Sequence, residues 1–163
     1  MAGKRLPLAS RAMAVQYKVY DRMRHPRAFE VARERGTASD LSALRGARQC
    51  LVITFRRSGE PVPTPVNFGL SDDGRLYFRS EPHVAKVKRI ERDPHVRVCP
   101  CNLRGKPTGP VAEGTARVLP AEESERAAAI VASNWSAWMR PFERAGDRIG
   151  MPSVYVEITP AST

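Results

Sequence analysis

The chain has 163 residues, of which 42% are hydrophobic and 27% are charged. This composition is that of an ordinary globular domain with a proper core, and it excludes a disordered tail or a collagen-like repeat. The 27 Lys and Arg residues outnumber the 17 Asp and Glu residues and give a formal net charge of +10. A surface with this charge attracts anions such as nucleic acid, anionic lipid or a phosphorylated small molecule.

Membrane insertion, secretion and a disulfide scaffold find no support in the sequence. No apolar run approaches the roughly 18 residues that span a bilayer, and the apolar stretch after Lys4 and Arg5 is too short for a signal peptide. Three cysteines, Cys50, Cys99 and Cys101, are too few for a disulfide framework and lack a metal-ligand spacing. We therefore expect a cytoplasmic protein with reduced thiols, no membrane insertion and no metal site.

The N-terminal part of the chain differs in character from the rest. Residues 1–36 lie in the most cationic stretch and are expected to form a basic, partly helical arm, since Met13, Tyr17 and Tyr20 recur at helical spacing. Residues 37–163 are expected to form the main domain.

Six β-strands are expected in that domain. β-branched and apolar runs separated by turn signals predict strands over residues 50–55, 61–68, 75–80, 95–99, 110–119 and 154–158. Pro61, Pro63 and Pro65 stand at alternate positions of the second strand and cannot donate ladder hydrogen bonds. That strand is therefore expected to lie at an edge or to pair on one side only.

Two helices are expected between these strands. The first lies between residues 82 and 93, with an apolar face of Val84, Val87 and Ile90, and the second runs from about residue 121 towards 144. The order of elements, with tight turns between strands, predicts a mainly β, α+β fold. We expect a six-stranded antiparallel sheet that forms a small closed or split barrel with flanking helices.

A strand end, a turn and a helix start over residues 79–89 form the first candidate site. Free N–H groups at a helix N-terminus bind anions, and Ser80 adds a hydroxyl donor. Lys86 and Arg89 share one face of the expected helix, so together they can clamp a phosphate. A solvated basic face opposite the apolar one explains the same pattern, and periodicity alone favours that explanation.

The proline-rich strand is the second candidate. Its aligned, unpaired backbone groups can hydrogen-bond the edge of a flat heterocycle. An edge strand that proline protects from aggregation explains the pattern as well and is favoured when the strand is considered alone.

The remaining aromatic residues point to packing, and the basic residues do not predict a nucleic-acid partner. Helical spacing of Val131, Trp135, Trp138 and Phe142 favours packing against the barrel or a second subunit, with an aromatic wall over a planar ligand as the alternative. Nucleic-acid binding needs aromatic residues interleaved with basic ones, but aromatics are only 7% of the chain. We therefore expect no nucleic-acid partner.

Several segments together resemble the pyridoxamine 5′-phosphate oxidase-like split-barrel family. Within it they are most similar to the actinobacterial group that uses the deazaflavin coenzyme F420. The similar segments are residues 51–55, 58–66, 74–79, 85–90, 93–96, 104–110, 113–119 and 155–159. The resemblance implies an FMN-binding type of split barrel and a homodimer with two cofactor sites between its subunits.

The resemblance also implies roles for individual residues. Lys86 matches the family lysine that holds the cofactor phosphate, and Ser80 and Arg89 match neighbouring positions that contact the phosphate or the tail. Further matches are Thr64, Pro65 and Val66 on the strand along the ring, and Arg79 and Lys88 as contacts to the acidic tail. Asn67 departs from the family pattern, in which an aromatic residue is frequent at that position.

With this resemblance, the clamp and the proline-rich strand become two halves of one cofactor site. The implied activity is an F420-dependent oxidoreductase that transfers hydride between the reduced deazaflavin and an electron-poor small-molecule acceptor. One alternative is an FMN-binding flavoprotein of the same fold. Another is a non-catalytic protein that binds the cofactor or a tetrapyrrole.

Overall fold

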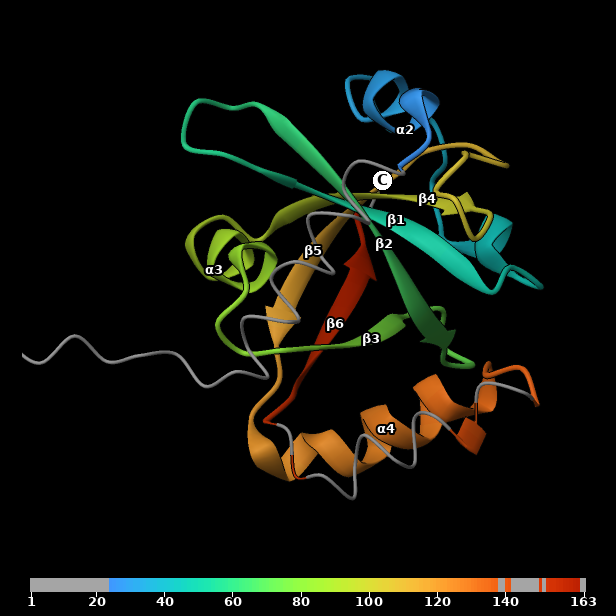
Figure 1. Cartoon of the computed structure of the whole chain (residues 1–163), viewed down its shortest axis with the longest axis vertical. Helices are drawn as coiled ribbons and strands as arrows, with labels where there is room; N and C mark the ends of the chain where they lie inside the picture. Colours follow the sequence, from blue (N-terminus) through green and yellow to red (C-terminus); the bar gives the residue numbers. More distant parts are fainter. Residues whose placement is uncertain (1–23, 138–139, 142–149, 151, 162–163) are drawn as a thin grey trace, which may run out of the picture.

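A closed barrel of six antiparallel strands forms the body of the molecule (Figure 1). The computed structural model describes residues 24–137, 140–141, 150 and 152–161. The strands are β1 (Gln49–Phe55), β2 (Pro61–Leu70), β3 (Leu76–Ser80), β4 (His95–Cys101), β5 (Ala112–Val118) and β6 (Val154–Pro160). Around the barrel they follow the order β1-β2-β3-β6-β5-β4. The expected six-stranded antiparallel barrel is thus confirmed.

Strand alternation fills the inside of the barrel. Side chains at every second position point inwards, and most of the inward set is fully buried. It includes Cys50, Val52, Val66, Phe68, Phe78, Val96, Val98, Val156 and Ile158. The hairpin between β1 and β2 turns at Gly59, whose φ of 83° is left-handed, as the turn sequence predicts.

The barrel splits beside the first half of β2. Residues 61–67 pair with β1, whereas β3 joins β2 only at residues 68–70. Beyond this point β3 continues along β6 as far as Ser80. The first half of β2 therefore pairs on one side only among the described strands, which confirms the expectation from its prolines.

Three helices cover separate parts of the barrel (Figure 1). α2 (Pro26–Val31) lies on the outer face of β1 and β4, α3 (Ala85–Arg92) packs against β1 and β5, and α4 (Ser124–Ser133) crosses β2, β3 and β6. The described residues also include two short 3₁₀ turns, η1 (Ser42–Leu44) and η2 (Ala121–Glu123), and two helical residues, 140–141. Within the described residues, no helix has the length and apolar character needed to cross a membrane.

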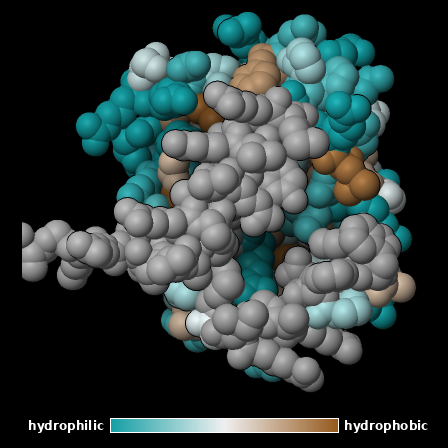
Figure 2. All heavy atoms as spheres, in the orientation of Figure 1, coloured by the Kyte–Doolittle hydropathy of each residue, from teal (hydrophilic) through white to brown (hydrophobic). Residues whose placement is uncertain are grey.

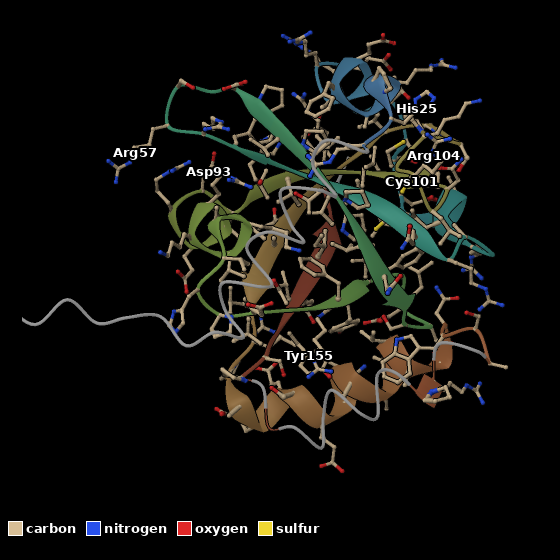
Figure 3. The ribbon with its side chains drawn as sticks, viewed as in Figure 1. His25, Arg57, Asp93, Cys101, Arg104 and Tyr155 are labelled. Carbon is tan, nitrogen blue, oxygen red and sulfur yellow. The ribbon has the colours of Figure 1, made fainter. Side chains whose placement is uncertain are left out.

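The described end of the N-terminal arm is fastened to the barrel. The backbone N–H of His25 donates to the carbonyl of Arg104 (3.0 Å), and both residues lie at the same end of the molecule in Figure 3. The backbone N–H of Gly36 donates to Oε1 of Glu113 at 2.7 Å. The division of the chain at residue 36 stays a prediction, and the expected helix around Met13 lies outside the described residues.

The second expected helix was wrong in its extent. α4 ends at Ser133 and residues 134–137 are not helical, although residues 140–141, beyond this break, are helical again. Asn134 follows the helix and turns its amide to donate to the carbonyls of Ala47 (3.0 Å) and Phe68 (2.9 Å). These bonds tie the chain to the end of the β1–β2 ladder, so the helix stops where the barrel supplies acceptors.

Trp135 packs against the buried cluster that includes Tyr77 and Leu119, on the side of the barrel that α4 covers. This confirms the expectation that Trp135 has a packing role. Trp138 and Phe142 lie outside the described residues. The three cysteines are free and buried, as expected for small apolar side chains.

Candidate functional site

Lys86 stands in the first turn of α3 and reaches back towards the barrel. Its Nζ lies 5.0 Å from the centre of the Phe78 ring, which points into the barrel from β3. The side chain is half-buried, and desolvation lowers the pKa of its amine from 10.5 to about 8. Burial thus makes the ammonium form costly, and an anion bound at Nζ would stabilise it.

Two guanidinium groups add to this positive charge. Arg89 and Arg24 both lower the pKa of Lys86 by charge repulsion, whereas Glu81 raises it. We call Lys86, Arg89 and Arg24 the cationic cluster. Like charges gathered around a desolvated amine form an arrangement that favours a multiply charged anion.

Arg89 is held by the end of β1. Its Nε donates to Oγ1 of Thr54 at 2.7 Å, and Thr54 is only 1% exposed. The hydrogen bond fixes the guanidinium on the same side of α3 as Lys86, in agreement with the three-residue spacing. The two residues expected to form a phosphate clamp are therefore brought together.

Arg24 was missed by the sequence reasoning. It comes from the N-terminal arm, and its Nη1 donates to the carbonyl of Pro63 on β2. Its guanidinium also lies over the ring of Phe29, 5.6 Å from the ring centre. The high positive charge of the arm is the signal that could have pointed to it, but nothing local indicates a contact with a strand 39 residues further on.

The first half of β2 has two distinct faces. Thr64 and Val66 lie on the same strand face as Phe68, which fills the barrel. Pro65 lies on the outer face, beside Gly105 of the loop after β4. The edge of this half-strand that does not pair with β1 lies where the barrel splits.

The remaining expected residues divide into two groups. Ser80 lies on the same face of β3 as Phe78, the ring that Lys86 covers. Arg79 lies on the opposite face and pairs across the strands with Tyr155, on the side of α4 (Figure 3). Lys88 is exposed and follows Lys86 by two positions, which places it on the other side of α3. The structure thus does not bring Arg79 and Lys88 to the cluster.

Asn67 is held on the outer face of the barrel. Its Oδ1 accepts a hydrogen bond from Nε2 of Gln49 at 3.0 Å. Oε1 of Gln49 is buried and has no hydrogen-bond partner among the described residues. Such orphaned acceptors are rare in folded proteins, where an ordered water commonly supplies the donor.

The surface around the site is polar. In Figure 2 the visible surface over the β1–β2 hairpin and α3 is mainly hydrophilic. Arg57 at the hairpin tip and Asp93 after α3 lie on this side of the molecule (Figure 3). Cationic groups, backbone acceptors and a barrel wall therefore meet at one place, and this donor and acceptor set fits a phosphorylated cofactor with a flat polar ring.

The fold and this site define a split-barrel protein with a cationic corner beside the split. The sequence model described as pyridoxamine 5′-phosphate oxidase matches residues 40–162. The chain therefore belongs to the pyridoxamine 5′-phosphate oxidase family. This family includes oxidoreductases, so membership supports a role in redox chemistry or in binding a flavin-type cofactor.

Solved structures share the fold at low sequence identity. A putative 5-nitroimidazole antibiotic resistance protein from Bacteroides thetaiotaomicron is 18% identical, with a TM-score of 0.55 over 74% of this chain and 77% of that one. The heme storage protein HutZ from Vibrio cholerae is 12% identical, with a TM-score of 0.54 over 76% and 92%. An FAD-binding protein from Mesorhizobium loti is 20% identical, with a TM-score of 0.50 over 74% and 84%. The comparison with curated protein sequences found no significant match.

Proposed function

We propose that the protein is an F420-dependent oxidoreductase that transfers hydride between the reduced deazaflavin and an electron-poor acceptor. The observation that carries the proposal is the cationic cluster at the split of the barrel. Lys86 has a pKa lowered to about 8 by burial, and Arg89 and Arg24 add further positive charge. A phosphate beside Nζ would offset the cost of keeping this amine charged.

The extent of the positive charge supports F420 over FMN. FMN carries one phosphate, whereas F420 carries a phosphodiester and an acidic tail. Lys88 is exposed on the side of α3 that faces away from the cluster. In our proposal the cluster holds the phosphate, while Lys88 and the general positive field of the chain attract the tail.

Each chain residue has a defined task in this proposal. Lys86 and Arg89 bind the phosphate, and the hydroxyl of Ser80 donates to it. Thr64, Pro65 and Val66 line and orient the ring through their backbone. The bound cofactor supplies the hydride chemistry, and the protein contributes position and electrostatics.

We further propose that two chains pair, with the cofactor sites between them, in the reducing cytoplasm, where the three cysteines stay as thiols. The apolar residues Phe29 and Leu103 are 42% and 72% exposed, and in our proposal the partner subunit covers them. Phe29 belongs to α2, and Leu103 belongs to the loop after β4, which lies at the same end of the molecule.

An FMN-binding flavoprotein is the second candidate. The cationic cluster favours it as well, since a phosphate monoester satisfies the same charges. Binding of either cofactor without turnover of any acceptor would instead indicate a carrier, and the test below includes a tetrapyrrole for that reason.

The test is a fluorescence titration of the purified protein with F420, FMN and haem at physiological salt. We expect F420 to bind at micromolar concentration or tighter, and Lys86→Ala to weaken binding by about 1–3 kcal/mol because it removes a charged phosphate contact. Lys106→Ala, an exposed loop lysine, is the matched control and should leave the dissociation constant unchanged. Equal binding of F420 by Lys86→Ala and wild type would contradict the assignment of Lys86 to a phosphate clamp. Preference for FMN or haem would overturn the F420 assignment.

A further inference from the structure

We infer that this site binds the reduced form of the ring more tightly than the oxidised form. The inference rests on the proposed function and concerns the chemistry of the strand edge that faces the ring. Over residues 61–65 this edge offers carbonyl acceptors and no N–H donor.

The direction of the backbone groups follows from two separate contacts. In an antiparallel strand, the N–H and C=O of one residue point to the same side. Arg24 donates to the carbonyl of Pro63, so the backbone of Pro63 faces away from β1. Asn134 donates jointly to the carbonyls of Phe68 and of Ala47, which precedes β1, so the backbone of Phe68 faces β1. Residues 63 and 68 are separated by an odd number of positions, so their backbone groups must point to opposite edges of the strand. The two contacts agree with this.

Alternation extends this result along β2. Pro61 and Pro65 face the free edge with Pro63, whereas Val62 and Thr64 face β1 and keep its ladder of hydrogen bonds. Proline has no N–H. This edge therefore presents three carbonyl oxygens in a row, of which that of Pro63 already accepts a hydrogen bond from Arg24, and the next N–H along it belongs to Asn67.

This edge is not taken up by a neighbouring described strand. β3 pairs with β2 only from Phe68 onwards. One described group that reaches this edge is the guanidinium of Arg24, which is a donor. This contact shows that the edge binds hydrogen-bond donors.

The two redox forms of the ring differ in the number of donors. The oxidised ring has one N–H in its pyrimidine part. Two-electron reduction takes up a hydride and a proton and adds a ring N–H in a deazaflavin, and a further one in a flavin. A row of carbonyls accepts these extra donors, but it leaves the bare ring nitrogen of the oxidised form facing oxygen lone pairs.

The preference has a measurable size. One buried hydrogen bond made in the reduced form and unmade in the oxidised form corresponds to about a tenfold difference in dissociation constant. Tighter binding of the reduced form raises the midpoint potential of the bound cofactor. For a two-electron couple, tenfold corresponds to about 30 mV.

The experiment measures the dissociation constants of oxidised and of reduced F420 anaerobically, together with the midpoint potential of the bound cofactor. The variant Pro65→Ala places an N–H on the edge at a position whose backbone is already extended. We expect wild type to bind reduced F420 about tenfold more tightly, and Pro65→Ala to move the ratio towards unity and the potential downwards. Pro63→Ala tests the same edge should Pro65→Ala fail to fold.

Pro120→Ala is the control, since Pro120 is exposed, extended and remote from β2 in sequence. It should retain the wild-type ratio and potential. Equal binding of the two forms by wild type, or an unchanged ratio in both edge variants, would overturn the inference and leave the proposed function standing. Failure of wild type to bind either form would overturn the proposed function as well.

Discussion

The amine of Lys86 links the pH dependence of this protein to its candidate site. Its pKa falls to about 8 in the folded protein, because burial disfavours the ammonium form. The unfolded chain keeps a pKa near the ordinary 10.5. Between these two values the unfolded state binds more protons, so this residue makes stability rise with pH.

A comparison of wild type with Lys86→Met tests whether Lys86 makes stability rise with pH. At neutral pH we expect Lys86→Met to have the higher free energy of unfolding, because wild type must bury a charge. The gap should narrow as pH rises from about 8 to about 10, as the folded amine loses its proton. Urea unfolding at several pH values gives the measurement, and a gap that is independent of pH would contradict the assigned pKa.

Individual residues of the candidate site also show how much of it the sequence pattern predicted. Lys86 and Arg89 were found from their spacing, because an i,i+3 pair on a helix is a local relation. Arg24 was not, since its contacts with Pro63 and its charge effect on Lys86 exist only after the arm has folded onto the barrel. Arg79 faces the other side of β3, although the resemblance placed it with the acidic tail.

Gly69 determines how closely α4 lies on β2. A Cβ at this position would lie 2.1 Å from the carbonyl oxygen of Ile130 and 2.9 Å from Cα of Val131. The backbone of the helix therefore packs directly on the strand. The same approach allows Asn134, just after the helix, to reach the carbonyl of Phe68.

Gly69→Ala is expected to push α4 away from the barrel. Overpacking of this kind costs about 1–3 kcal/mol, and the helix backbone offers no flexible side chain that could move aside. Urea unfolding followed by tryptophan fluorescence measures the loss, with Thr159→Ala on an exposed strand position as the control. An unchanged unfolding midpoint in Gly69→Ala would show that the helix is free to shift.

At this scale the strands were more predictable than the helices. Each strand has its own alternation and turn residues, which are local signals. The one-sided pairing of β2 followed from its prolines alone. The end of α4 was not predicted, because the acceptors that hold the Asn134 side chain come from β2 and from Ala47, far away in the sequence.

The whole molecule carries a net charge of +10, and this field acts on any anion that approaches it. The cationic cluster is a local concentration of that charge. Salt screens such attraction over about 10 Å at 0.1 M ionic strength. Binding of a cofactor with several negative charges should therefore depend strongly on salt.

We expect the dissociation constant of F420 to rise more steeply with salt than that of FMN, because F420 carries more negative charge. Titrations between about 50 and 300 mM NaCl measure both slopes, over a range in which screening increases markedly. Riboflavin, which lacks the phosphate, is the control and should show little salt dependence. Parallel slopes for F420 and FMN would argue against a contact between the protein and the acidic tail.

By itself the sequence determined the number of strands, the turns between them, the one-sided pairing of β2 and the pairing of Lys86 with Arg89. All of these depend on residues close together in the chain, through alternation, turn chemistry or helical spacing. Tertiary structure alone decided that Arg24 joins the cluster, that α4 stops at Ser133, and that β3 joins β2 only from Phe68 onwards. Those features depend on contacts between segments far apart in the chain, which exist only once the barrel has closed.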